Sequence, residues 1–346
     1  MSAVDDQPTR RRLVLVLGAE GSGGDALAGV LRTLGMGAPQ RRADPAPTGE
    51  VPRWVADLHE ELLQRCNVDP VDARPSAWFD TGRLAHLEPL RARVHRWLEE
   101  RLVDDGPELV LRDPRLAWFV GVWRSAALRC DADLSCVTVL RHPASSTGPT
   151  RGADDDPADV SSVAGWLNGQ LHAERATRGT ARAFVRHDDL VADWTVPVAA
   201  LGTALDLPAV REAGANDIRA VHTYLRGGGP TAGRAWDDVD LPAGLRDLAD
   251  RAWDALGGLV ETPDDADLLA RLDEVRADYT TTYDQAAALT WSSSRAAHRA
   301  GLRTLPAPGR AVVGRGADRV PHGVRAAVPA GLRRRLRRVL GRPGTV

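Results

Sequence analysis

A glycine-rich stretch near the N-terminus has the composition of an anion-binding loop. Residues 13–31 read LVLVLGAEGSGGDALAGVL, and between the apolar run and the helix-periodic segment lie Gly18, Gly21, Ser22, Gly23 and Gly24. Successive backbone N–H groups and a helix N-terminus can bind a phosphate without any side chain. The stretch therefore predicts an anion site, although a tight strand-to-helix turn with Asp25 as N-cap explains the same residues equally well.

This loop lacks the side chains that nucleoside triphosphate hydrolysis needs. In the pattern GxxxxGK[ST], Gly18 and Gly23 fit, but Gly24 replaces the lysine and Asp25 replaces the hydroxyl that holds Mg²⁺. An ATPase, a GTPase or an ordinary kinase is therefore disfavoured, and no metal is expected. Mg²⁺-dependent binding of ATP would revive the nucleotide kinase hypothesis.

Three further polar clusters each follow a short apolar run. RDPR (112–115) follows residues 109–111, RHP (141–143) follows residues 136–140, and RHDD (186–189) follows residues 183–185. Helix-periodic segments separate these runs, which predicts an α/β fold with a parallel sheet flanked by helices. Ligands of such sheets bind beyond the carboxyl ends of the strands, so the loop and the clusters are expected to form one site.

Composition and patterning divide the chain into three parts. Residues 1–11 are polar and predicted to be disordered, residues 12–285 form the α/β domain, and residues 286–346 form a basic extension. The apolar periodicity predicts helices over 27–34, 55–63 and 87–102, and a mostly helical part from 196 to about 288. No internal repeat is present.

The composition favours a cytoplasmic protein. Of the 346 residues 43% are hydrophobic and 27% charged, and no run of eighteen apolar residues could span a membrane. The apolar run after TRRR stops at Glu20 and leads into a helix pattern, which favours a core strand over a signal peptide. The three cysteines, Cys66, Cys130 and Cys136, lack metal-site spacing and suit a reducing compartment.

The basic residues of this chain are unevenly placed. All of them are arginine, and residues 291–346 hold thirteen arginines and one aspartate, although the net charge is only −2. Such a tail favours peripheral contact with a membrane surface or another anionic partner. A solvated helix, or one that packs on the acidic body, explains it as well. Nucleic acid binding is disfavoured, because no aromatic residues are interleaved with the charges.

Four motifs in order resemble the sulfotransferases that use 3′-phosphoadenosine-5′-phosphosulfate (PAPS), in particular their bacterial branch. GSGG (21–24) stands where that family has a phosphosulfate loop of the type (Arg/Lys)-Ser-Gly-Thr, followed by ALAGVL. LVLRDPRLAWFVGVWR (109–124) is similar to its strand ending in Lys-Asp-Pro-Arg-Leu, and VTVLRHP (137–143) to its strand that holds the 3′-phosphate. Trp166, AERATRG (173–179) and AFVRHDDLVADW (183–194) match a further pattern.

The resemblance implies a P-loop-like sulfotransferase fold with a helical C-terminal part, PAPS as cofactor, and specific site residues. Sulfuryl transfer to a hydroxyl or amine of a carbohydrate, lipid or small metabolite would be the activity. Arg112 would replace the family's lysine, Arg141 would hold the 3′-phosphate, and Ser22 with the loop glycines the 5′-phosphate. The resemblance implies Glu50 as the general base, with Asp113 and His59 as alternatives.

The departures from the family pattern fall on the cofactor contacts. Gly21 replaces a cation, Gly24 a hydroxyl, and Pro149 a serine, for which Ser145, Ser146 or Arg151 could substitute. Each lost charge-assisted hydrogen bond is worth roughly 1.5–3 kcal/mol. A catalytically silent relative that binds a ligand or partner is therefore the alternative, and on that hypothesis Gly21→Arg with Gly24→Thr should create or raise activity.

Overall fold

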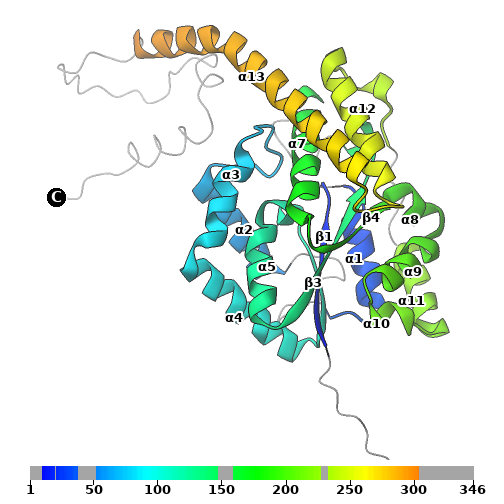
Figure 1. The fold of residues 1–346 in the computed structure, drawn as a ribbon. Helices are drawn as coiled ribbons and strands as arrows, with labels where there is room; N and C mark the ends of the chain where they lie inside the picture. Colours follow the sequence, from blue (N-terminus) through cyan, green and yellow to red (C-terminus); the bar gives the residue numbers. More distant parts are fainter. Residues whose placement is uncertain (1–9, 20, 38–51, 147–158, 227–232, 304–346) are drawn as a thin grey trace, which may run out of the picture. The chain divides into compact units, whose positions relative to one another are not determined.

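The fold is a parallel sheet with helices on both faces, seen in a computed structural model (Figure 1). The structure describes residues 10–19, 21–37, 52–146, 159–226 and 233–303. Its strands, β1 (Arg11–Leu17), β2 (Glu108–Arg112), β3 (Ala132–Leu140) and β4 (Ala181–Arg186), form one sheet in the order β2-β1-β3-β4. All three pairings are parallel, so the predicted α/β class is confirmed.

Except for α1, the helices that precede β3 in the chain cover one face of the sheet. They are α1 (Gly24–Thr33), α2 (Arg53–Cys66), α3 (Ala77–Gly82), η1 (Arg83–His86), α4 (Glu88–Asp104), η2 (Leu116–Phe119) and α5 (Val120–Arg129). The helices after β3 are α6 (Pro143–Ser146), α7 (Asp159–Thr177), α8 (His187–Asp193), α9 (Thr195–Ala204), α10 (Pro208–Arg211), α11 (Ala215–Arg226), η3 (Trp236–Asp238), α12 (Ala243–Gly258) and α13 (Ala266–Arg303).

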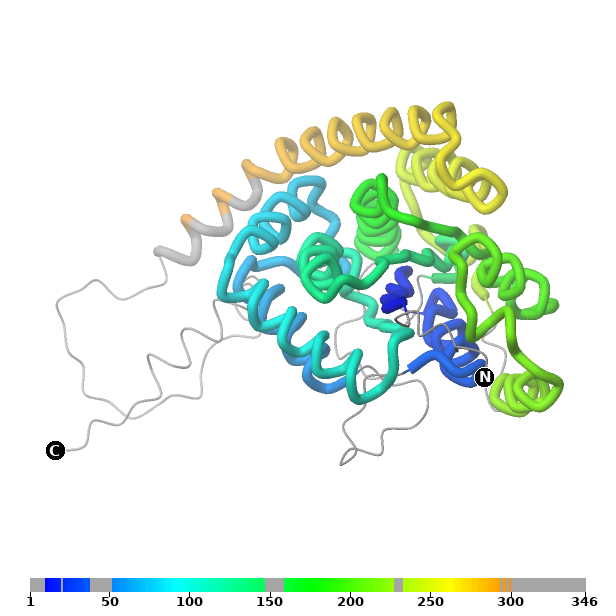
Figure 2. Tube along the Cα trace, turned by 60° about the horizontal axis from the view of Figure 1, so that its bottom comes forward, coloured from blue at the N-terminus to red at the C-terminus, as the bar shows by residue number. Residues whose placement is uncertain are grey.

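The alternation along β1 explains the two layers. Leu13, Leu15 and Leu17 belong to a buried cluster with α2, α4 and α5, whereas Val14 and Val16 belong to a cluster with α1 and α8–α11. Successive side chains of a strand point to opposite faces, so a continuous apolar run must be covered twice. Figure 2 shows β1 between α1 on one side and α2, α4 and α5 on the other.

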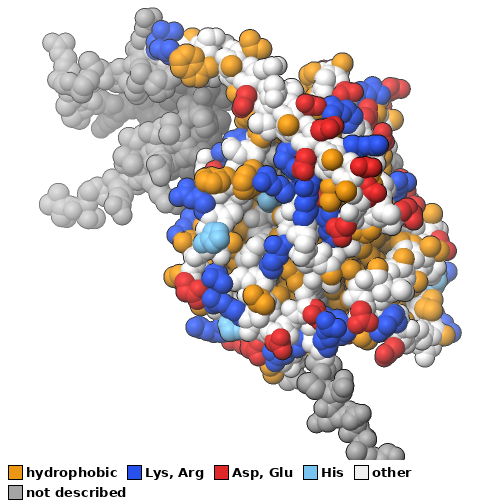
Figure 3. Space-filling model, viewed as in Figure 1, with side chains coloured by type: hydrophobic (Ala, Val, Ile, Leu, Met, Phe, Trp, Pro, Cys, Tyr) orange, Lys and Arg blue, Asp and Glu red, His pale blue; other side chains and the backbone are white. Residues whose placement is uncertain are grey.

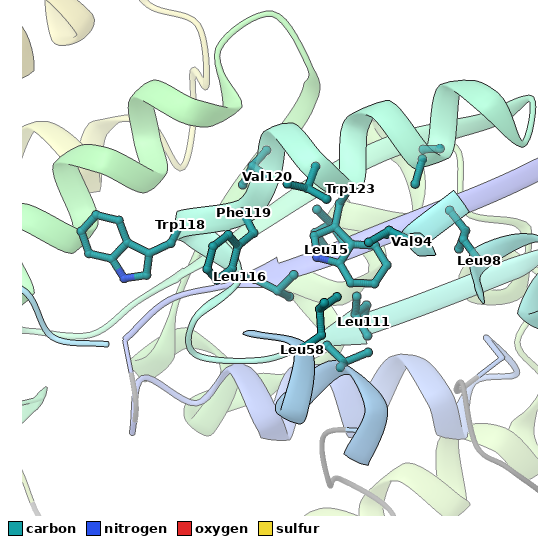
Figure 4. Close-up of a cluster of buried hydrophobic side chains, with 14 of the residues drawn as sticks. Leu15, Leu58, Val94, Leu98, Leu111, Leu116, Trp118, Phe119, Val120 and Trp123 are labelled. Carbon is teal, nitrogen blue, oxygen red and sulfur yellow. The ribbon is translucent and has the colours of Figure 1, made fainter. Parts of the chain in front are cut away.

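Aromatic and aliphatic side chains fill the layer between β1 and α5. In Figure 4, Trp123 and Phe119 lie beside Leu15 and Leu111, with Leu58 and Val94 closing the cluster from α2 and α4. A fully buried side chain of this size contributes about 1.5–3 kcal/mol. This layer fixes the sheet edge from which Arg112 emerges.

Helix α4 shows how local sequence sets an element. Pro89 stands in its first turn, where the missing N–H costs nothing, and Leu90, Val94, Leu98 and Leu102 recur on the buried face. The helix begins one residue later than the apolar pattern predicted and ends two residues later.

The chain divides into two units after Thr280, within α13. The first unit contains the sheet, the glycine loop and the residues that follow the strands. Over the second unit the structure describes the helical residues 281–303, which include the exposed Leu289 and Trp291. Among the described residues, no helix is both long and apolar enough to cross a membrane. The predicted boundaries at 11/12 and 285/286 stay predictions.

Candidate functional site

The loop between β1 and α1 needs glycine at three positions. Gly18, Gly21 and Gly23 have φ angles of 133°, 72° and 91°, which L-residues rarely adopt. A Cβ at Gly18 would lie 2.7 Å from the carbonyl oxygen of Val139, and a Cβ at Gly23 would lie 2.5 Å from Cδ2 of His187. The loop therefore runs close against β3 and against the residue that follows β4.

Ser22 lies in this loop with a buried hydroxyl. Its side chain is 0% exposed, and its Oγ has no hydrogen-bond partner among the described residues. Directly after it, α1 begins at Gly24 without a side-chain cap at Gly23. An unmade hydrogen bond of a buried hydroxyl costs about 1–3 kcal/mol. A loop hydroxyl beside uncapped helix N–H groups fits an oxyanion ligand.

Two arginines flank the loop from the strands on either side of β1. Arg112 is the last residue of β2 and Arg141 follows β3 directly. Nη2 of Arg112 donates to the carbonyl oxygen of Ala19 (3.3 Å), and Nη1 of Arg141 donates to that of Gly21 (2.6 Å). The predicted convergence of Arg112, Arg141 and the glycine loop at one sheet edge is thus seen in the structure.

Both guanidinium groups are withdrawn from solvent. Arg112 is 0% exposed and Arg141 6%. A buried charge is costly unless an opposite charge or hydrogen bonds compensate it. Asp25 in the first turn of α1 supplies part of this compensation, with Oδ1 3.5 Å from Nε of Arg112. Its side chain is 53% exposed, so the pair reaches from the interior to the surface.

Arg112 occupies the space that a side chain at position 24 would need. A Cβ built on Gly24 would lie 2.5 Å from Nε and 2.9 Å from Cζ of Arg112. The guanidinium is buried and bonded to Ala19, so it cannot simply swing aside. The resembled pattern has a lysine at position 112 and a hydroxyl residue at position 24. The side chain of Arg112 fills the space that a side chain at position 24 would need, so these two departures depend on each other.

Asp113 is held in a buried network. Arg115 donates to it from the backbone N–H (2.7 Å), Nε (2.9 Å) and Nη2 (2.8 Å), while Nδ1 of His59 lies 3.3 Å from Oδ2. Burial raises the pKa of Asp113, but the hydrogen bonds of His59 and Arg115 outweigh it and hold the pKa well below its ordinary value. A carboxylate of this kind is a poor general base, and its geometry suits it to fixing the turn after β2.

His59, the other candidate base, is a core residue. It is 0% exposed, its Nε2 accepts a hydrogen bond from Nε1 of Trp123 (3.0 Å), and its ring stacks on Phe119. Burial lowers the pKa of His59, with Asp113 opposing the shift. The neutral ring therefore bridges Trp123 and Asp113.

Ser145 and Ser146 lie just after Arg141, and their hydroxyls bond to backbone. Oγ of Ser145 donates to the carbonyl oxygen of Arg234 (3.1 Å), and Oγ of Ser146 lies 3.3 Å from the carbonyl oxygen of Arg141 and 3.1 Å from that of His142. These contacts fix the turn that carries Arg141. Glu50 and Arg151, like Glu20 and Pro149, lie outside the described residues, so their predicted roles stay predictions.

His187, which directly follows β4, also lies against the loop. Its Cδ2 lies against Gly23, and its Nδ1 is 3.3 Å from Oδ1 of Asp188. The signal for this position was its place at the carboxyl end of β4. The imidazole therefore covers the start of α1 from the side of β4.

No family model matches the chain, and no curated protein matches it. Two solved structures are similar to it. The Sulfotransferase Domain from the Synechococcus PCC 7002 Olefin Synthase has a TM-score of 0.35 and 15% identity, over 68% of this chain and 98% of that one. The Sulfotransferase Domain from the Curacin Biosynthetic Pathway has a TM-score of 0.39 and 15% identity, over 73% and 99%.

Proposed function

We propose that this protein is a sulfotransferase that transfers a sulfuryl group from PAPS to a hydroxyl or amine of a carbohydrate, lipid or small metabolite. The observation that carries the proposal is the pair Arg112 and Arg141, which lie on both sides of a glycine loop with the buried hydroxyl of Ser22. Two positive charges beside an uncapped helix N-terminus favour a ligand with two phosphate groups.

The residues of the site fit such a ligand in distinct roles. Ser22 and the loop N–H groups would bind the 5′-phosphate, and Arg112 would neutralise charge that develops on the leaving phosphate. Arg141 would bind the 3′-phosphate. When bound, the cofactor supplies the activated sulfuryl group. The protein's contribution is to hold donor and acceptor in line and to stabilise charge that appears during transfer.

The acceptor's proton needs a base, and the described residues narrow the choice. Asp113 and His59 are buried and contact each other. Asp113 also accepts hydrogen bonds from Arg115, and His59 accepts one from Trp123, so neither is placed to accept a proton from a substrate. Glu50 thus remains the candidate, as a proposal from the sequence. The acceptor class and a peripheral contact of the arginine-rich tail with an anionic surface are proposals from the sequence as well.

A catalytically silent binding protein is the second candidate function. The observation that favours it is the ion pair between Arg112 and Asp25, which places a carboxylate in the first turn of α1. An anionic side chain at this position competes with a bound phosphate for the same cation. On this alternative the site binds a nucleotide, and sulfuryl transfer does not follow.

Binding of adenosine 3′,5′-bisphosphate, measured by calorimetry, tests the shared part of both functions. We expect binding by the bisphosphate and none by ATP with Mg²⁺. Arg141→Gln should weaken it about 10- to 100-fold, because a charge-assisted hydrogen bond to phosphate is lost. Arg129→Gln is the matched control, since Arg129 pairs with Glu88 at the surface.

Turnover then separates the two functions. Incubation with PAPS and a panel of sugar, lipid and phenolic acceptors should yield a sulfated product that depends on Arg112 and Arg141. Binding of the bisphosphate without any product would support the silent alternative. Failure of the bisphosphate to bind would contradict sulfuryl transfer from PAPS and nucleotide binding, and would favour a silent relative that binds a protein partner.

A further inference from the structure

A second group of chemically active side chains lies at the other end of the sheet. Cys130 precedes β3, whereas Arg141 follows it, so the two residues mark opposite ends of the same strand. His95 and Glu99 of α4 face Cys130, and one ligand atom from each of the three lies within 4.8 Å of the others. Within the part of the chain that the structure describes, no other group of His, Cys, Asp and Glu meets this condition.

The local fold brings these three side chains together. His95 and Glu99 are four residues apart on one helix, so they share a face. Cys130 ends α5, where its N–H donates to the carbonyl oxygens of Ala126 and Ala127 (both 3.1 Å). Its Sγ contacts the carbonyl oxygen of His95 (3.8 Å), and the residue is 2% exposed. Cys130 is therefore fixed, whereas the other two side chains approach it from a more open side.

We propose that His95, Glu99 and Cys130 form a zinc site, with water as the fourth ligand. Imidazole nitrogen, thiolate sulfur and carboxylate oxygen are the ligands that Zn²⁺ takes in proteins, at about 2.0–2.3 Å. Ligand atoms of a tetrahedral site at these bond lengths are about 3.5 Å apart, so small side-chain rotations close the present separation. On binding, the thiol of Cys130 releases its proton to solvent as the zinc–sulfur bond forms.

Arg11 decides how firmly the site holds a metal. Its Nη1 donates to both carboxylate oxygens of Glu99 (3.0 and 2.9 Å) and to the carbonyl oxygen of Cys130 (3.0 Å). Arg11 and a cation thus compete for Glu99, and zinc must displace the guanidinium from the carboxylate. The same contact keeps Glu99 turned toward Cys130 when no metal is bound.

Such a site would tie α4 to the junction of α5 and β3. A ligand that binds the folded state alone stabilises it by an amount that grows with its concentration over Kd. Zinc should therefore raise the Tm of the full chain. The two sites lie at opposite ends of β3 and zinc binding is measured without nucleotide, so its outcome is independent of the proposed sulfotransferase activity.

Zinc titration of the chelator-treated full chain tests the proposal. We expect one equivalent bound, and a sulfur-to-cobalt charge-transfer band when Co²⁺ replaces zinc. Cys130→Ser and His95→Gln should each weaken binding about 100-fold or more and abolish or shift this band, since each removes a ligand. Cys66→Ser and His86→Gln are the matched controls, because neither residue belongs to the group.

Arg11→Gln covers the case in which a ligand variant fails to fold. It leaves all three ligands in place and removes the competing cation, so zinc affinity should rise. No binding by the wild-type chain, equal losses in the control variants, or an unchanged or weaker affinity in Arg11→Gln would each overturn the proposal.

Discussion

At the scale of single residues, the charge of Asp25 should lower the affinity of the glycine loop for the proposed phosphate ligand. Asp25 lies in the first turn of α1, and its carboxylate is 3.5 Å from Nε of Arg112. A phosphate bound at this helix end would interact with the same positive charge. We predict that Asp25→Asn tightens binding of adenosine 3′,5′-bisphosphate about fivefold. The effect stays near 1 kcal/mol because the half-exposed side chain is screened by solvent.

Calorimetry of Asp25→Asn at low and high salt measures this effect. The gain should shrink at high ionic strength, as expected for a charge effect. Asp57→Asn is the control, because Asp57 pairs with Arg53 on the surface of α2. Weaker binding by Asp25→Asn would mean that Asp25 supports the site by holding Arg112 in place.

Gly24 and Arg112 should behave as a coupled pair. Gly24→Thr forces the buried guanidinium from its place, because the new Cβ would lie 2.5 Å from Nε. We predict a loss of about 1–3 kcal/mol of unfolding free energy, and a clearly smaller loss when Arg112→Lys is present. Adding Gly24→Thr alone is therefore a poor way to restore activity, and Gly21→Arg would be strained by its φ of 72°.

Urea unfolding of the two single variants and the double variant gives the coupling free energy between positions 24 and 112. Gly169→Thr in α7 is the matched control, since nothing lies within 4 Å of a Cβ at that position. Strictly additive losses would show that Arg112 moves aside freely.

At the scale of elements, the strands were predictable because each is a continuous apolar run. Their ends were not, since Arg11, Glu108 and Ala132 join the sheet through backbone pairing, which does not depend on apolar side chains. The convergence of Arg112 and Arg141 on the glycine loop was predictable, because the carboxyl ends of parallel strands meet at one edge. The clash between Arg112 and a side chain at position 24 depends on the conformation of the Arg112 side chain, which the sequence pattern does not predict.

Residues far apart in the sequence were the hardest to predict. His95 and Cys130 are 35 positions apart in the sequence, and the packing of α4 against α5 brings them together. The roles of Asp113 and His59 were hidden in the same way. Each is a plausible base by type, and the hydrogen bonds of Trp123 and Arg115 make them parts of a buried network.

The packing of α7 on η2 should depend on pH. His172 stacks on Trp118 with ring centroids 4.9 Å apart, and its Nε2 is buried. Burial lowers the pKa of His172 to about 4, against an opposing backbone hydrogen bond at Ala117. The folded state therefore favours the neutral ring, and the unfolded chain, with an ordinary pKa of about 6.5, takes up the proton first.

It follows that His172 destabilises the fold as pH falls from about 6.5 to about 4 and has little effect above that window. We predict that the wild-type chain loses about 2 kcal/mol more unfolding free energy than His172→Gln between pH 7 and pH 5. Urea unfolding at both pH values measures this difference. His222→Gln, an exposed histidine of α11, should show the wild-type pH dependence. Equal slopes for wild type and His172→Gln would contradict the prediction.

At the scale of the whole molecule, a buried ion cluster joins helices and sheet within residues 10–280. Glu174 of α7 is 0% exposed and accepts from Nε of Arg178 (2.8 Å) and Nη1 of Arg182 (3.2 Å), the latter on β4. Nη2 of Arg276, on α13, lies 3.4 Å from its other oxygen. On the face of the molecule seen in Figure 3, acidic and basic side chains are interspersed around α7 and α12.

Replacing Glu174 by Gln should therefore be costly. The change removes one negative charge while three arginines stay near it, and an uncompensated buried charge costs about 3–5 kcal/mol. Arg182 is the most affected, since its side chain is 1% exposed and, among the described residues, it keeps only Asp264, which is largely solvated, as a carboxylate partner. Urea unfolding should show this loss with little dependence on salt.

The control is Glu61→Gln, which breaks an exposed pair with Arg93 (2.8 Å) and should cost less than about 1 kcal/mol. Equal costs for both variants would mean that the cluster is solvated and does not join β4 to α7. A large cost with unchanged nucleotide binding would show that Glu174, within AERATRG (173–179), supports the scaffold and that nucleotide binding does not depend on it.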